Sequence, residues 1–247
     1  MKKEFVFGMF AVVLFTFGSC QKELFPDSFH IGCDDGMALK LVNNKCAEAK
    51  YGEEKAIELD VDEDGQPDLK FYTYATDSLG DQDRRGSSVW SLDGNIEFGY
   101  EVKYEDLYSV TKSSSQCLKE IIYNARSHFY CPDCQNLGIK KSKFSYSTPV
   151  MLQEGNTLSR EIKWSDKLQI LSQLDQSRQY SKEKGNTMIY NNILAGIWDR
   201  KTEGYIPIRK QARFGKYQYG WIKIRVVDHR RIEIYEIGLQ DQIHWTF

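Results

Sequence analysis

Four aspartates and a glycine fall within nine consecutive residues, from position 60 to position 68. Three of the aspartates alternate along the chain, the glycine follows the third, and the fourth aspartate closes the stretch. A hard cation such as Ca²⁺ prefers about six to eight oxygen ligands, and a tight loop commonly supplies them from positions 1, 3, 5, 7 and 9, with glycine at position 6 for the sharp turn. The spacing therefore predicts a Ca²⁺ site with a structural role. Its predicted ligands are the four carboxylates and one backbone carbonyl: Asp60, Asp62, Asp64, Gln66 and Asp68.

The pattern D-x-D-x-D-G-x-x-D resembles the calcium loops of EF-hand, dockerin-like and FG-GAP-like repeats. It departs from the EF-hand at position 12, where Phe71 replaces a bidentate glutamate, and at position 8, where Pro67 disfavours a continuing helix. The flanks, 56–59 and 69–74, alternate and are rich in β-branched and aromatic residues, which predicts a strand on each side. Without the position-12 glutamate we expect a weak site, with a Kd of about 10⁻⁴ M or above. The alternative is an acidic hairpin turn that holds no ion.

The N-terminus has the pattern of an exported protein. A basic start, residues 1–3, precedes an apolar stretch over 5–17 that is shorter than the about 20 residues of a membrane span and is typical of a signal peptide. The sequence Phe17-Gly18-Ser19-Cys20 follows, and it resembles the lipobox of bacterial lipoproteins, in which the cysteine is acylated and becomes the mature N-terminus. The resemblance implies a signal peptide over 1–19 and lipid attachment at Cys20. An ordinary secretory signal is the alternative.

This interpretation places the protein outside the cytoplasm, anchored by lipid to the outer membrane on its periplasmic or its surface face. We expect a tether over residues 20–32, then a single β-rich domain over 33–247, a length that suits one sandwich or barrel. The net charge is −2 and no Lys/Arg run is long, so the electrostatic footprint of a nucleic-acid-binding protein is absent. The expected partners are the membrane, through the anchor, and a glycan or an envelope protein.

Five cysteines remain if the lipobox cysteine carries lipid, and an oxidising compartment makes disulfides the default. Cys33 and Cys46 are natural partners because they close a short loop, a link worth about 3 kcal/mol. Cys117 is expected to pair with Cys131 or Cys134, and the odd count leaves one thiol free or in an intermolecular bond. The Cys131-Pro132-Asp133-Cys134 stretch is also compatible with a redox motif or, with Cys117 and His128, with a zinc site.

Alternating apolar residues predict mainly β structure, an antiparallel β-sandwich or a partly open barrel with one or two short helices. Strands at 89–92 and 96–102 around Asp93-Gly94-Asn95 have the signature of a hairpin. Strict alternation from Tyr219 to Val226, with Ile222, Ile224 and Val226 on one face, predicts a strand that returns through residues 232–235.

Other segments carry weaker signals. Residues 33–50 are expected to form a disulfide-framed loop with a helical turn near Ala47, and residues 76–88 a polar loop. Residues 113–116 resemble a capping box, and apolar residues at helical spacing follow up to Ala125, which predicts a short helix. The stretch 162–174 fits a strand and a helix equally well, and residues 175–186 fit a surface loop or a hairpin tip.

No catalytic motif stands out. The four histidines lie in no H-E-x-x-H pattern, and no G-x-S-x-G nucleophile elbow or phosphate-binding glycine loop is present. Three carboxylates on or near one strand, Glu97, Glu101 and Glu105, keep a glycan-active hydrolase as the alternative function, since glycosidases use two facing carboxylates. Tyrosines at 100, 104 and 108 are compatible with stacking on sugar rings, although sheet packing explains them equally well. A thiol or zinc protein centred on Cys131 and Cys134 is a third alternative.

A second resemblance lies near the C-terminus. The sequence Tyr219-Gly220-Trp221-Ile222-Lys223-Ile224, followed by a hairpin return, is similar to a pattern in secreted or lipid-anchored envelope proteins that often also carry the D-x-D-x-D-G-x-x-D loop between N-terminal strands. The resemblance implies a β-rich extracytoplasmic domain with a calcium loop and no enzymatic activity. The sequence thus predicts a non-enzymatic envelope lipoprotein that serves in adhesion, glycan capture or structural support.

Overall fold

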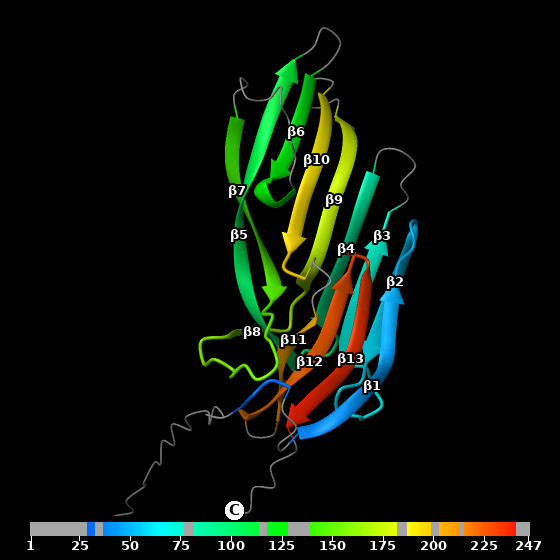
Figure 1. Cartoon of the computed structure of the whole chain (residues 1–247), viewed down its shortest axis with the longest axis vertical. Coiled ribbons are helices and arrows are strands. Elements are labelled where there is room, and N and C mark those ends of the chain that lie inside the picture. The colour runs from blue at the N-terminus through cyan, green and yellow to red at the C-terminus, as the bar shows by residue number, and fades with distance from the viewer. Residues whose placement is uncertain are drawn as a thin grey trace, which may run out of the picture.

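A computed structural model of the chain (Figure 1) describes residues 29–32, 37–76, 82–113, 118–127, 139–181, 187–198, 203–212 and 215–240. Within these ranges the chain forms thirteen strands and one short 3₁₀ turn. The strands are β1 (Met37–Glu48), β2 (Glu53–Leu59), β3 (Leu69–Ala75), β4 (Gln82–Ser91), β5 (Ile96–Ser113), β6 (Leu118–Asn124), β7 (Ile139–Pro149), β8 (Lys163–Ser165), β9 (Gln169–Ser181), β10 (Thr187–Gly196), β11 (Glu203–Gln211), β12 (Tyr217–Val227) and β13 (Arg231–Gln240), and the turn is η1 (Ala125–Ser127).

The strands join into one nearly closed, barrel-like sheet. Hydrogen-bonded neighbours follow the order β1-β13-β12-β11-β5-β6-β10-β9-β4-β3-β2, and β7 and β8 pair with β5 outside this path. The two end strands lie side by side (Figure 1), and Lys45 Nζ on β1 donates a hydrogen bond of 3.4 Å to the carbonyl of Glu58 on β2. The pairs are antiparallel apart from β10 and β6, which run parallel. The prediction of a mainly β fold is confirmed.

The sheet has two regions (Figure 1). We call "barrel" the lower part, formed by β1–β3, β11–β13 and the adjoining ends of β4, β5 and β9. We call "projecting sheet" the part that rises above it, formed by β6, β10 and residues 101–113 of β5, 139–147 of β7 and 173–181 of β9. The main apolar cluster lies in the barrel and contains Phe71, Phe98, Trp198, Ile206 and Ile222, all fully buried.

Alternation explains why the barrel closes around this cluster. On β3 the odd-numbered residues from Leu69 to Ala75 are buried while the residues between them are half-exposed. On β12 the predicted inward residues Ile222, Ile224 and Val226 are fully buried, and β12 returns as β13 through a turn at 228–230, so this hairpin prediction is confirmed. Period-two patterning places one face of each strand in the core and the other outside.

A second apolar cluster covers the outside of the barrel. Phe29 and Ile31 are buried there against Tyr219 and Trp221 of β12. The phenyl ring of Phe29 lies 6.3 Å from the ring of Tyr219, centroid to centroid. The predicted tether over 20–32 is therefore too long, because residues 29–32 are docked on the sheet; residues 20–28, like the predicted signal peptide, lie outside the described part of the chain.

The predicted helix after residue 113 is wrong. Residues 118–124 form strand β6, and only the 3₁₀ turn Ala125–Ser127 follows it. β6 is hydrogen-bonded to β5 on one side and β10 on the other, and the ring of Tyr123 stacks on Tyr108 at 5.4 Å. Ile121, Ile122 and Tyr123 favour a sheet with neighbours on both sides, and this tertiary pairing overrides the local capping signal.

Two loop predictions are corrected in the same way. Strand β1 occupies most of the predicted loop over 33–50, and β4 begins at Gln82 inside the predicted loop over 76–88. For residues 175–186 the structure favours the hairpin alternative, because β9 runs on to Ser181 and pairs antiparallel with β10 from Thr187. The undecided stretch 162–174 contains β8 and the start of β9. Polar side chains are tolerated in these strands because one face of each lies outside the barrel.

The strands around Asp93-Gly94-Asn95 do not form the predicted hairpin. β4 pairs with β3 and β9, whereas β5 pairs with β6, β7, β8 and β11. The turn instead carries the chain across one end of the barrel, where the amide of Leu92 donates a 2.7 Å hydrogen bond to the carbonyl of Asp68. Within the described ranges, no helix is long and apolar enough to cross a membrane.

Candidate metal centre

The acidic loop joins β2 to β3, which pair from Glu53↔Ala75 to Leu59↔Leu69, so the predicted strand–loop–strand arrangement is confirmed. Leu59 and Leu69 at its base are buried in the main apolar cluster, and Val61 inside the loop is buried with them. The loop is thus attached to the end of the barrel core by an apolar residue at its second position. This attachment lets its neighbours, Asp60 and Asp62, stay partly exposed.

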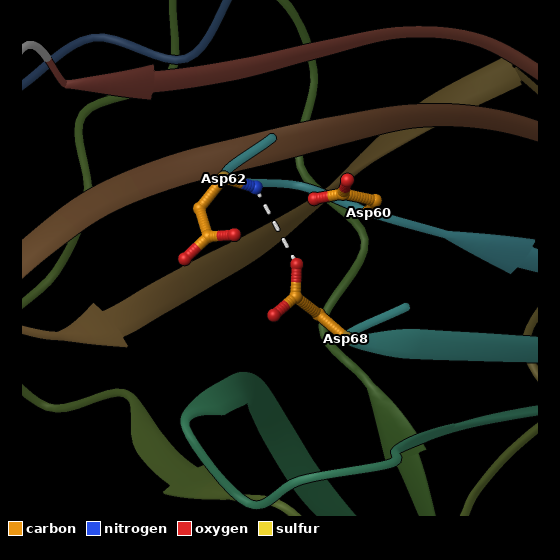
Figure 2. Close-up of side chains that lie close together, drawn as sticks. All are labelled: Asp60, Asp62 and Asp68. Carbon is orange, nitrogen blue, oxygen red and sulfur yellow. Dashed lines mark hydrogen bonds between the residues drawn. The ribbon is translucent and has the colours of Figure 1, made fainter. Parts of the chain in front are cut away.

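Three of the four aspartates converge (Figure 2). One oxygen each from Asp60, Asp62 and Asp68 lies within 4.8 Å of the other two. In Figure 2 the carboxylates of Asp60 and Asp62, from one side of the loop, lie near that of Asp68, from the other. Oxygens this close together repel unless a cation or a donor lies among them. The geometry therefore provides three carboxylate ligands for a hard cation.

Hydrogen bonds inside the loop hold Asp60 in place. Its carboxylate accepts from the amide of Glu63 at 2.6 Å and from the amide of Gly65 at 2.9 Å. Gly65 has a φ of 90°, in the left-handed region that glycine adopts without strain, as expected for position 6 of the loop. The backbone thus turns around the first carboxylate.

The other predicted ligands are not part of the cluster. Asp64 is exposed and accepts a 2.8 Å hydrogen bond from the amide of Gln66, which is exposed as well. The structure therefore brings together Asp60, Asp62 and Asp68 and leaves Asp64 and Gln66 on the solvent side of the loop. A cation that took all five predicted ligands would require the tip of the loop to close over it.

Asp68 is the most deeply placed carboxylate, with only 4% of its surface exposed. One of its oxygens accepts hydrogen bonds from the amides of Val61 at 2.6 Å and Asp62 at 3.4 Å. Burial raises the pKa of Asp68 above its usual range, the hydrogen bond from Val61 opposes the rise, and the nearby charges of Asp93, Asp60 and Asp64 add to it. A bound cation would favour the ionised form of this side chain.

A residue that the sequence reasoning missed also belongs to the site. Lys210 of β11 forms a hydrogen-bonded ion pair with the carboxylate of Asp62, and only 17% of its side chain is exposed. Burial lowers the pKa of Lys210, while the charge of Asp60 acts in the opposite direction. Lys210 is 148 residues from Asp62 in the chain, so no local spacing could have indicated it. Its ammonium group neutralises part of the cluster and competes with any metal ion for Asp62.

Asp93 is a second residue near the acidic loop that the sequence did not predict there. It lies in the turn after β4, and its charge acts on Asp68. Its carboxylate accepts a 2.9 Å hydrogen bond from the amide of Asn95, which fixes the turn. The Asp-Gly-Asn signal predicted a turn, but not that the turn would lie beside the acidic loop.

Of the six cysteines, Cys46 alone lies within the described residues. It is on β1, it is exposed and its thiol is free, so the structure shows no disulfide between Cys46 and Cys33. The other candidate cysteines lie outside the described residues: Cys20, Cys33, Cys117, Cys131 and Cys134.

Each of the three carboxylates considered for catalysis forms an ion pair with a different basic side chain. The ion pairs are Glu97 with Arg209, Glu101 with Lys103 and Glu105 with Arg126. Ser172 Oγ lies 2.6 Å from Nδ1 of His229, but Ser172 is fully buried, so a substrate cannot reach this hydroxyl. His128 and His244 lie outside the described residues. None of these arrangements supports a catalytic centre among the described residues.

The fold and the site define a mainly β protein with a nearly closed sheet and an acidic loop at one end of its core. In comparisons with known proteins, no family model matches the chain, and no curated protein or solved structure matches it.

Proposed function

We propose that the protein is a non-enzymatic envelope lipoprotein, anchored to the outer membrane through Cys20, whose β-domain is stabilised by Ca²⁺ at the acidic loop and serves in adhesion, glycan capture or structural support. One observation carries the calcium part of this proposal. The carboxylates of Asp60, Asp62 and Asp68 converge within 4.8 Å at the end of the barrel core. The lipobox-like sequence ending at Cys20 carries the anchor.

Electrostatics explains the role of the ion. Carboxylates about 5 Å apart repel by roughly 1–3 kcal/mol per pair, depending on the effective dielectric, and a dication converts that repulsion into attraction. With a Kd of about 10⁻⁴ M, Ca²⁺ at about 1 mM stabilises the folded state by about 1–1.5 kcal/mol. This magnitude suits a loop that fastens β2 to β3 and closes the end of the core, and it is too small to be the main source of stability.

The anchor would also orient the domain. Phe29 is buried on the barrel only nine residues after Cys20, so the lipid and the barrel are at most about 32 Å apart. The projecting sheet rises from the opposite end of the barrel (Figure 1). A lipid-anchored molecule would therefore hold the barrel near the bilayer and present the projecting sheet away from it. A mass spectrum of the mature N-terminus tests the anchor, and a Cys20 without acyl groups would rule it out.

The calcium part is tested by thermal melting with and without a chelator. We expect chelation to lower the Tm of the unaltered protein by a few degrees, since about 1 kcal/mol corresponds to about 2–4 °C for a domain of this size. The double variant Asp62→Ala plus Asp64→Ala should melt at the same temperature in both conditions. Lys210→Met removes the competing ammonium group, so it should tighten Ca²⁺ binding and enlarge the effect of chelation.

Glu63→Gln is the matched control. It removes one charge from the same loop at a position that is not a predicted ligand, and it should leave the effect of chelation in place. If chelation does not change the Tm of the unaltered protein or of Lys210→Met, the loop is an acidic turn and the calcium proposal fails.

A further inference from the structure

Among the described strands, none pairs with one part of one edge of strand β5. Tyr100 pairs with Pro149 of β7 and Lys163 of β8, so these two strands lie on opposite sides of β5. Leu107 pairs with Ser142 of β7 and with Asn124 of β6, so β6 is on the same side as β8. On that side, no described strand pairs with residues 101–106. A six-residue gap therefore separates β8 from β6, where the barrel passes into the projecting sheet.

Tyr104 lies in the middle of this gap and is 72% exposed. Two hollows of about 400 Å³ and 390 Å³ adjoin it, and Tyr104 lines both. Each volume falls in the range of about 300–1,000 Å³ typical of small-molecule sites. An exposed tyrosine offers an apolar ring face together with a hydroxyl group that forms hydrogen bonds. We call the two hollows with their shared tyrosine the Tyr104 site.

The first hollow combines apolar surface with two carboxylates and one ammonium group. Tyr100 and the exposed Val102 line it from β5, next to Glu101. Glu161 and Lys163 line it from the opposite side. The hollow thus offers an apolar strip along β5 and both acceptors and donors of hydrogen bonds at its rim.

The second hollow has a fixed polar floor. Arg126 Nη1 donates to Glu105 Oε1 at 3.0 Å and to the hydroxyl of Tyr146 at 3.1 Å, and Tyr146 in turn donates to Glu105 at 2.7 Å. All three residues line the hollow. Polar groups held in one geometry before a ligand arrives lose little entropy on binding, which favours affinity.

The charges of the site nearly cancel. Lys103 of the second hollow is paired with Glu101 of the first at 2.6 Å, and Asp106 is paired with Lys141 at 2.6 Å. Taken together, the linings of the two hollows hold four carboxylates and three cationic side chains. An anionic ligand such as a phosphate or a nucleic acid finds no surplus of positive charge here. A neutral ligand rich in hydroxyl groups can use both kinds of partner.

We propose that the Tyr104 site binds a neutral saccharide chain, with one sugar unit in each hollow. A pyranose ring has a face of C–H groups that packs on an aromatic ring, and its hydroxyls both donate and accept hydrogen bonds. Tyr104 and Val102 supply the apolar contact, and the paired carboxylates and cations supply the polar ones. This inference rests on the proposed non-enzymatic binding role and selects glycan capture within it. It does not require the calcium loop, which lies at the barrel end.

The test is a binding titration of the folded protein against neutral oligosaccharides of glucose, galactose, mannose and N-acetylglucosamine. We expect at least one of these to bind, with Tyr104→Ala weakening binding about tenfold or more. Tyr104→Phe keeps the ring and should retain most of the affinity. Tyr51→Ala, which removes another exposed tyrosine, outside the site, is the matched control and should bind as the unaltered protein does. Melting curves confirm that each variant is folded.

Each result decides the proposal. It is overturned if no oligosaccharide binds, if Tyr104→Ala binds as well as the unaltered protein, or if only an extended peptide binds, along the edge of β5 at residues 101–106. Repeating the titration with Asp62→Ala plus Asp64→Ala separates the two sites, because saccharide binding should persist in this variant. A protein whose melting responds to Ca²⁺ but which binds no sugar would keep the calcium loop and refute the saccharide site.

Discussion

The barrel and the projecting sheet are parts of one sheet, yet they are held together differently. The main apolar cluster draws its members from the barrel strands and the segments next to them, including Phe71, Phe98 and Ile206. Among the described residues, 101–149 and 173–194 contribute no member to it. In the projecting sheet the described side chains of β6 and β10 are mostly half-exposed. The barrel therefore depends on apolar burial and the projecting sheet on other interactions.

Those interactions include a polar network at the base of the projecting sheet. Asn124 at the end of β6 is fully buried, and its side-chain amide donates to the carboxylate of Glu105 and, at 2.6 Å, to the carbonyl of Leu194. Arg126 and Tyr146 complete the network around Glu105. A network whose members are all satisfied fixes one geometry, whereas an apolar core supplies more free energy. The comparison indicates a stable barrel that carries a less stable projecting sheet with a fixed geometry at its base.

The largest expected effect tests the barrel. Phe71→Ala removes a fully buried ring from the main cluster and should lower the free energy of unfolding by about 3–5 kcal/mol. Tyr108→Ala removes a half-exposed ring that stacks on Tyr123 in the projecting sheet, and it should cost about 1 kcal/mol. Urea unfolding curves measure both values. Equal losses in the two variants would contradict the division into an apolar barrel and a polar projecting sheet.

A smaller effect is expected from the polar network. Arg126→Met leaves Glu105 without its cationic partner, although the carboxylate is only 15% exposed. Breaking a fully buried pair costs about 3–5 kcal/mol, and because the Arg126 side chain is 28% exposed we expect a loss of about 2 kcal/mol. The double variant with Glu105→Gln removes the unpaired charge and should recover part of the loss. If Arg126→Met unfolds at the same urea concentration as the unaltered protein, the network does not stabilise the projecting sheet.

The sequence predicted the parts of the fold that depend on local patterns. Alternation identified β2, β3, β12 and β13, and the loop motif located three carboxylates that converge. Period-two patterning is a property of each strand alone, so it can be read without knowledge of the partners. The β12–β13 hairpin was also predictable because its strands are adjacent in sequence.

Pairing between distant segments was not predictable in this way. The apolar residues of β6 have the spacing of a helix, but the strand is hydrogen-bonded to β5 and β10. The turn after β4 leads to β5, which does not pair with β4. Lys210 reaches Asp62 only because β11 passes the acidic loop in the folded barrel. Tertiary contacts of this kind override local propensity. The candidate metal site could therefore be located from the sequence, whereas the ammonium group of Lys210, which pairs with one of its carboxylates, could not.

The smallest expected effect concerns pH. Tyr146 donates a 2.7 Å hydrogen bond to Glu105. Burial, then this hydrogen bond and the charge of Glu105, raise the pKa of Tyr146 to about 12, although Arg126 and the backbone of Gly196 act in the opposite direction. In the unfolded chain the hydroxyl loses its proton near about pH 10. The folded state therefore holds one more proton between about pH 10 and 12, and the free energy of unfolding falls as the pH rises through that range.

Tyr146→Phe removes this dependence. The protonated hydroxyl of Tyr146 stabilises the folded state fully below about pH 10. There, Tyr146→Phe should have a lower free energy of unfolding than the unaltered protein. Near about pH 11.5 the unaltered protein has lost part of this stabilisation, so the gap between the two proteins should be smaller. Urea unfolding at about pH 9 and about pH 11.5 measures the change. Tyr72 also has a pKa raised to about 12, mainly by burial, so Tyr72→Phe shows whether the response is specific to the projecting sheet. A stability difference between Tyr146→Phe and the unaltered protein that stays constant with pH would show that the hydroxyl titrates as freely in the folded state as in the unfolded chain.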